Sequence, residues 1–79
     1  MGPAARARTD DETGLLAAVG ARVRARRERA GLSQEALAER SGHHRNFVGG
    51  VERGEQNVSV LGLARLADAL GCGVAELLP

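Results

Sequence analysis

The chain has 79 residues, of which 43% are hydrophobic, and a formal net charge of +1 at pH 7. A domain of this size buries only about 60% of the surface that its unfolded chain exposes, so a partner subunit is plausible on stability grounds alone. No stretch approaches the ~18 apolar residues of a membrane span, and we expect no contact with a membrane.

The composition favours an all-α fold. Phe47 is the single aromatic residue, so Leu, Val and Ala must build the core. No segment alternates polar with apolar β-branched residues in the manner of a half-buried strand. All eleven basic residues are Arg, whose planar guanidinium donates two parallel hydrogen bonds to phosphate or guanine.

Residues 1–13 are small, polar and mixed in charge, and we expect a flexible N-terminal tail. They contain no apolar core of a signal peptide. Arg6 and Arg8 could reach DNA as an arm, but the acidic residues at 10–12 oppose phosphate contact. A mobile tail is therefore the preferred interpretation.

A first helix is predicted from Gly14 to Ala30, with one face stepping by three or four residues. That face holds Leu16, Val19, Val23, Arg27 and Ala30. Arg27 needs a partner there, because an unpaired buried charge is costly. Five Arg residues between positions 22 and 29 are opposed only by Glu28; this cluster fits phosphate binding and a solvated helix face about equally.

The second helix is predicted to begin with Ser33 as its N-cap and Glu35 in its first turn, where the helix dipole favours an acid. Gln34 lies near the exposed N–H groups of this helix start, which suit a phosphate. Ala38 faces inward and is small enough to let two helices cross closely. Gly42 then supplies the sharp turn that ends the helix.

A third helix is predicted to start near His44 and end by Gly54. Its apolar face holds Phe47, Val48 and Val51. Its outer face holds Arg45, Asn46, Gly49, Gly50 and Arg53. Arg reads guanine through O6 and N7, and Asn reads adenine through N6 and N7, so this pattern is typical of a recognition helix.

Two further features of this helix carry predictions. Gly49 and Gly50 cost about 0.5–1 kcal/mol each relative to Ala inside a helix. We favour the interpretation that they let the backbone approach DNA closely; the alternative is a short, relaxed helix that needs no side chain there. Glu52 flanks the apolar face and is the predicted ion-pair partner of Arg27.

A polar connection over residues 55–58 leads to a fourth helix, capped by Ser59 and ended by Gly71. Its apolar face holds Leu63, Leu66, Ala67 and Leu70. A last turn or helix follows, and its apolar residues are Val74, Leu77 and Leu78. We expect these three to close the core and to form a dimer interface with a second copy.

No catalytic or metal site is expected. Cys72 is the single cysteine, which excludes an intramolecular disulfide and fits a reducing compartment, the cytoplasm, and no base is placed near it. His43 and His44 are adjacent and would point about 100° apart on a helix, so they do not converge on one ion. We expect His43 in the turn and His44 as a helix cap that touches DNA.

The combined motifs resemble the Cro/lambda-repressor-like helix-turn-helix family, also called the xenobiotic-response-element family. They are Ser33-Gln34-Glu35, Leu37-Ala38, Gly42, Glu52-Arg53-Gly54, Ser59 and Leu70-Gly71. The resemblance covers about residues 19–78 and is strongest to the controller proteins of restriction–modification systems. It implies a compact five-helix bundle over residues 14–79 that binds operator DNA, usually as a dimer.

Position by position, the resemblance implies a phosphate contact for Gln34, base-reading positions at the start of the third helix, and a buried Arg27–Glu52 pair. Gly50 matches a base-facing position but has no side chain, and Val58 stands where many relatives carry Pro. The complete predicted DNA-binding set is Ser33, Gln34, His43, His44, Arg45, Asn46, Gly49, Gly50, Arg53 and Asn57.

The predicted function is that of a transcriptional regulator that binds a palindromic operator as a homodimer, in the bacterial cytoplasm at the nucleoid. Two copies would place their recognition helices in successive major grooves, about 34 Å apart. No cofactor, metal or small-molecule ligand is implied, and we expect no enzymatic activity. The alternative is an antitoxin or adaptor that uses the same fold to bind a protein partner.

Overall fold

The computed structural model describes Asp11 and residues 13–79. Its elements are α2 (Leu15–Arg29), α3 (Gln34–Ser41), α4 (Arg45–Glu52), α5 (Val60–Leu70) and the 3-10 helix η1 (Val74–Leu77). Within this part of the chain no strand occurs, and the predicted all-α class is confirmed. Most of the predicted tail, residues 1–10 and 12, lies outside the described residues.

The expected fifth helix is replaced by η1, a four-residue 3-10 helix. Gly73 and Leu78, at its two ends, both have extended backbone angles. The segment between them is therefore too short for the hydrogen bonds of a full α-helical turn. The described part of the chain forms a bundle of four α-helices closed by one 3-10 turn.

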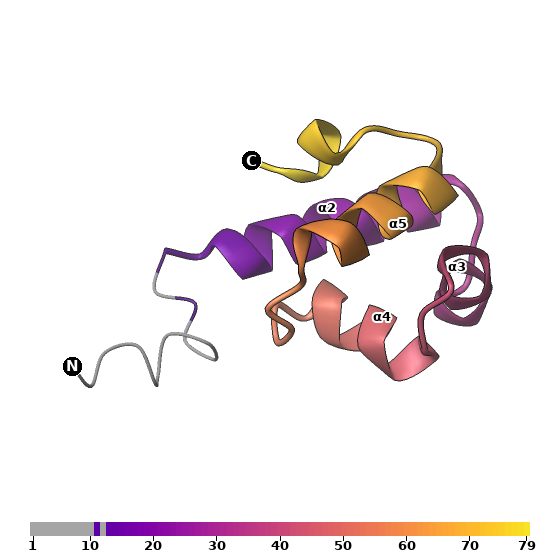
Figure 1. Ribbon diagram of the computed structural model, residues 1–79, viewed down its shortest axis with the longest axis horizontal. Coiled ribbons are helices and arrows are strands. Elements are labelled where there is room, and N and C mark those ends of the chain that lie inside the picture. The colour runs from indigo at the N-terminus through magenta and orange to yellow at the C-terminus, as the bar shows by residue number, and fades with distance from the viewer. Residues whose placement is uncertain (1–10, 12) are drawn as a thin grey trace.

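In Figure 1, α5 crosses in front of α2, α4 lies below them, α3 lies at one end and η1 lies above. Helix α4 packs against α2 and α3, while α5 packs against α3. The chain then doubles back so that η1 lies against both α2 and α5 (Figure 1). The α3–α4 pair, joined by a tight turn, therefore sits to one side of the scaffold that α2, α5 and η1 build.

Helix α2 begins with a cap that the sequence did not suggest. The Asp11 carboxylate accepts hydrogen bonds from the backbone N–H groups of Leu16 at 2.9 Å and Ala17 at 2.8 Å. Thr13 Oγ1 accepts another, from Leu15 N at 3.3 Å. These bonds satisfy N–H groups that a helix start otherwise leaves open. Asp11, which the sequence placed in the tail, therefore contributes to the start of α2.

The other helix starts follow the predicted capping residues. Ser33 Oγ accepts from Ala36 N at 3.0 Å, and Ser59 Oγ accepts from Gly62 N at 2.9 Å. At the start of α4, His44 Nδ1 accepts from Asn46 N at 3.0 Å, so the predicted cap by His44 is confirmed. Gly42 ends α3 with a φ of 77°, the left-handed conformation predicted for this turn.

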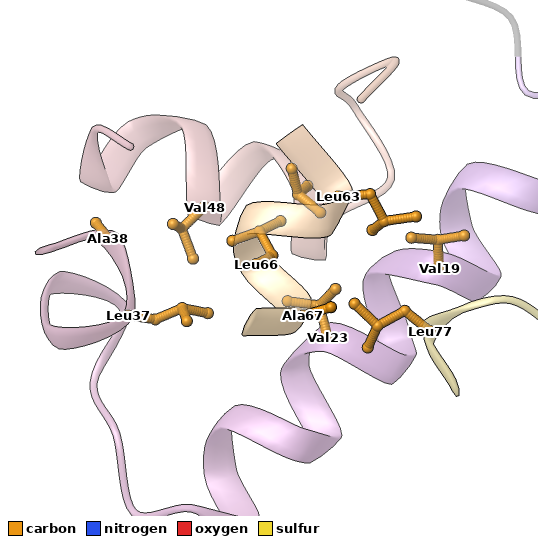
Figure 2. Packing of buried hydrophobic residues seen from close by; sticks show 10 residues of the cluster. Val19, Val23, Leu37, Ala38, Val48, Leu63, Leu66, Ala67 and Leu77 are labelled. Atoms are coloured by element: carbon orange, nitrogen blue, oxygen red, sulfur yellow. The ribbon is translucent and has the colours of Figure 1, made fainter. Parts of the chain in front are cut away.

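The core is built from aliphatic side chains of all five elements (Figure 2). Its buried members are Val19, Val23, Leu37, Ala38, Val48, Val51, Leu63, Leu66, Ala67 and Leu77. Phe47, Val58, Leu70 and Val74 pack against this cluster from partly exposed positions. Ala30, which the helical spacing assigned to the buried face, is exposed because it is the C-cap of α2, where the chain leaves the bundle.

Leu77 is completely buried in the core, so its assignment to a dimer interface is wrong. In a 3-10 helix, residues three apart eclipse each other. Val74 and Leu77 therefore point to the same side, toward α2 and α5, while Leu78 leaves that side and is 41% exposed. Of the three predicted interface residues, only Leu78 is exposed, and Val74 is half-buried.

The crossing of α2 and α4 is closer than a side chain would allow. A Cβ atom on Gly20 of α2 would collide with the carbonyl oxygen of Val51 and lie 2.8 Å from that of Glu52. At the end of α4, Gly54 has a φ of +75°, and a Cβ atom there would lie 2.9 Å from Ala17 Cα. These two glycines fix the distance of α4 from the scaffold.

Candidate nucleic-acid interface

A buried ion pair ties α2 to α4. Arg27 Nε donates to Glu52 Oε2 at 2.6 Å and Arg27 Nη2 donates to Glu52 Oε1 at 3.0 Å, a two-pronged contact. The side chains are 12% and 3% exposed, respectively, and the pKa of Arg27 is raised by its hydrogen bond to the Glu52 carboxylate. The predicted Arg27–Glu52 pair is confirmed.

The same carboxylate extends this network to α3. Gln34 Nε2 donates to Glu52 Oε1 at 3.1 Å, and Arg27 Nη1 donates to the carbonyl oxygen of Leu32 at 2.8 Å. The pair therefore fixes both the start of α3 and the orientation of Gln34. One of the two amide hydrogens that Gln34 could offer to a phosphate is already engaged by Glu52.

The start of α4 presents the two side chains predicted to read bases. Arg45 and Asn46 are exposed, and so is the capping residue His44. On the opposite side of the helix, Val48 and Val51 are buried in the core. Since positions three or four apart share a helix face, the polar face begins at Asn46 and continues through Gly50 to Arg53.

Arg45 and Arg53 are both paired on the surface. Arg45 Nη1 lies 2.8 Å from Glu35 Oε2, and Arg53 Nε lies 3.0 Å from Glu55 Oε1. All four side chains are 59–62% exposed. Exposed pairs of this kind are worth only about 0–1 kcal/mol, so a phosphate or a base edge can displace them.

Gly49 and Gly50 are buried, which corrects their placement on an open outer face. A Cβ atom on Gly49 would lie 3.0 Å from Arg53 Nη1 and 3.5 Å from Gln34 Oε1. A Cβ atom on Gly50 would lie 2.8 Å from Gln56 Cγ. The backbone of both glycines is therefore covered by polar side chains, which occupy the space that a side chain at these positions would fill.

His43 lies apart from the other predicted DNA-binding residues. Its ring packs in a tilted arrangement against Phe47 with centroids 4.4 Å apart, and its Nε2 is 3.4 Å from the carbonyl oxygen of Gly62 in α5. Ser33 and Asn57 are exposed, at the start of α3 and in the loop after α4. The structure thus brings together Gln34, Arg45, Asn46 and Arg53, and directs His43 toward the scaffold.

The structure also adds residues to this surface that sequence reasoning missed. Glu35 was assigned only to the helix dipole, yet it holds Arg45. Gln56 was part of a polar connection, yet it covers Gly50. The paired glycines were the available signal, because a missing side chain on a polar helix face leaves room for a neighbour.

Several large apolar side chains of other elements remain on the surface. They are Leu15, Val60, Leu61 and Leu78, of which Val60 is 80% and Leu61 61% exposed. Val60 and Leu61 are consecutive residues in the first turn of α5. Among the described residues, no helix is both long and apolar enough to cross a membrane, and no group of three or more His, Cys, Asp or Glu side chains could hold a metal ion.

The chain is similar in sequence and in fold to known proteins. Control protein C.SmaI of Serratia marcescens is 52% identical over 56 residues, which are 71% of this chain and 67% of that protein. The crystal structure of the restriction–modification controller protein C.AhdI from Aeromonas hydrophila superposes with a TM-score of 0.78 at 49% identity, covering 80% of this chain and 96% of that one. The regulator SinR, solved in complex with DNA, superposes with a TM-score of 0.71 at 28% identity over 75% of this chain and 95% of that one. Residues 23–77 match the helix-turn-helix family, and the chain belongs to that family, as its motifs predicted.

Proposed function

We propose that this helix-turn-helix DNA-binding regulator binds a two-fold-symmetric operator as a homodimer and so controls transcription. The observation that carries the proposal is the polar start of α4, where Arg45 and Asn46 stand exposed on a helix fixed from behind by the Arg27–Glu52 pair. The similarity to proteins named C.SmaI and C.AhdI supports a role as the controller protein of a restriction–modification system.

In this proposal α4 enters the major groove. Arg45 leaves Glu35 and donates to O6 and N7 of a guanine, and Asn46 pairs with the N6 and N7 edge of an adenine. Ser33 and Gln34, at the start of α3, approach a phosphate, where backbone N–H groups and the helix dipole favour an anion. These phosphate contacts set the register, while the base contacts select the sequence.

The proposed dimer uses an apolar surface different from the predicted one. Leu77 closes the core, so we assign the contact with a second copy to the exposed residues Val60 and Leu61 of α5, together with Leu78, the one residue shared with the predicted interface. Two such copies related by a two-fold axis would present their α4 helices to half-sites about 34 Å apart. As a regulator of this kind, the protein would act in the cytoplasm at the bacterial nucleoid, with neither cofactor nor catalysis.

Selection of binding sites from a random duplex library tests the proposal. We expect a two-fold-symmetric motif with half-sites about one helical turn apart, and a salt dependence set by the number of phosphate contacts. Weak binding that salt abolishes, with no motif recovered, would contradict sequence-specific recognition. Capture of a protein partner in place of DNA would instead support an antitoxin or adaptor.

The variant Arg45→Ala checks the role of the recognition helix. We expect a loss of about 1–3 kcal/mol on the selected operator and relaxed discrimination at one base pair of each half-site. Competition assays with single-base-pair operator variants measure both effects. An equal loss on the operator and on random DNA would show that Arg45 binds phosphate.

A further inference from the structure

The recognition helix contains two positions without side chains on its polar face. Gly49 and Gly50 lie between Asn46 and Arg53, at spacings that place all four residues on adjoining parts of that face. Neither glycine has a left-handed backbone, so the helix itself does not require glycine here. The space above them is filled by side chains that follow α4 in the sequence.

The chain after α4 is held so that it returns over these glycines. Glu55 N donates to the carbonyl oxygen of Gly50 at 2.8 Å, and Gly54 supplies the left-handed turn that this bond needs. Gln56 then lies on Gly50, with its Cγ 2.8 Å and its Nε2 3.4 Å from the site that a Cβ would occupy. Arg53, paired with Glu55, lies in the same way over Gly49.

Packing of the fold alone does not explain glycine at position 50. All three of the nearest atoms that an added Cβ would meet belong to the flexible side chain of Gln56. An alanine would require the whole Gln56 side chain to turn away, because its Cγ lies 2.8 Å from the new Cβ, while the helix would gain the higher propensity of alanine. The group that depends on glycine at this position is Gln56 itself.

We propose that Gln56 is a specificity-determining residue of the DNA surface and that Gly50 is its positioning residue. The inference rests on the proposed function, because it assigns a further contact to the same interface. Gln56 lies against the polar face of α4, so its side-chain amide supplies the donor and acceptor that position 50 lacks. A glutamine amide pairs with the N6 and N7 edge of an adenine, and we assign Gln56 to such an edge.

The test compares Gly50→Ala, Gln56→Ala and the double variant on the operator selected by the wild-type protein. We expect each single variant to bind about 5- to 100-fold more weakly and to lose preference at the same base pair of each half-site. The double variant should lose no more than either single one, because both changes remove one contact. The melting temperature of Gly50→Ala should be unchanged or higher.

A second glycine supplies the matched control. Gly49→Ala would displace Arg53 and Gln34 rather than Gln56, so any loss that it causes should add to that of Gln56→Ala. Gln56 is exposed, so Gln56→Ala keeps the inference testable even if Gly50→Ala folds poorly.

Four outcomes would overturn the inference. Additive losses for Gly50→Ala and Gln56→Ala would show that Gly50 does not position Gln56. Equal losses on the operator and on random DNA would show that Gln56 reads no base. Unchanged operator binding by both variants would show that Gln56 makes no contact with the operator, and the proposed function would still stand. A wild-type protein that prefers no duplex would overturn both the inference and the proposed function.

Discussion

At the scale of single residues, the Arg27–Glu52 pair connects the fold to the proposed DNA-binding surface. Both residues of the pair were predictable. Arg27 is a charged residue on an apolar helix face and requires a counter-charge, and Glu52 flanks the apolar face of α4. Its third member was not predictable: Gln34 was assigned to a phosphate, yet its amide also donates to Glu52. A single-sequence pattern gives the face of a side chain, but not which of several polar groups on that face it will contact.

The variant Arg27→Ala should therefore destabilise the protein strongly. Glu52 is 3% exposed and would keep only the Gln34 amide as a partner, and breaking a buried pair from one side costs about 3–5 kcal/mol. Arg24→Ala is the matched control, since it breaks an α2 pair with Glu28 whose side chains are 64% and 53% exposed. Thermal or denaturant unfolding should show a change of no more than about 1 kcal/mol for Arg24→Ala. Equal stabilities of the two variants would contradict the structural role of the buried pair.

At the scale of elements, the position of the recognition helix depends on a glycine that the apolar pattern could not reveal. The predicted buried face of α2 included Leu16, Val19 and Val23. It did not include Gly20, because glycine has no side chain. The spacing held a signal nonetheless, because Gly20 is four residues after Leu16 and three before Val23. By contrast, the α3–α4 turn was predicted correctly, since capping residues and a left-handed glycine are local requirements.

The variant Gly20→Ala should push α4 away from α2. Its Cβ would meet carbonyl oxygens of Val51 and Glu52, which are backbone atoms and cannot move without shifting α4. We expect a loss of about 1–3 kcal/mol in unfolding free energy, together with weaker binding to the operator. Gly50→Ala is the comparison, because its new methyl group meets only a flexible side chain. A Gly20→Ala protein as stable as the wild type would show that the crossing tolerates a wider separation.

At the scale of the whole molecule, the C-terminal apolar residues show that a sequence pattern does not predict which apolar side chains stay exposed. Val74, Leu77 and Leu78 were grouped because they are close in sequence, but the 3-10 geometry sends Val74 and Leu77 inward and Leu78 outward. Val60 and Leu61 were not predicted to form an interface, because they precede the apolar face of α5 in the sequence. Which apolar residues a small domain leaves exposed depends on how its last element closes the core, and that requires the complete three-dimensional packing.

This difference separates two variants that would otherwise be treated alike. Leu77→Ala should cost about 2–5 kcal/mol of stability by leaving a cavity between α2, α5 and η1. Leu61→Ser, at a position 61% exposed, should change the stability of the monomer little and weaken the proposed dimer. Sedimentation across a micromolar dilution series, combined with thermal unfolding, distinguishes the two effects. If Leu61→Ser dimerises as tightly as the wild type, the interface lies elsewhere on the surface. If the wild-type protein stays monomeric, each recognition helix binds a single half-site.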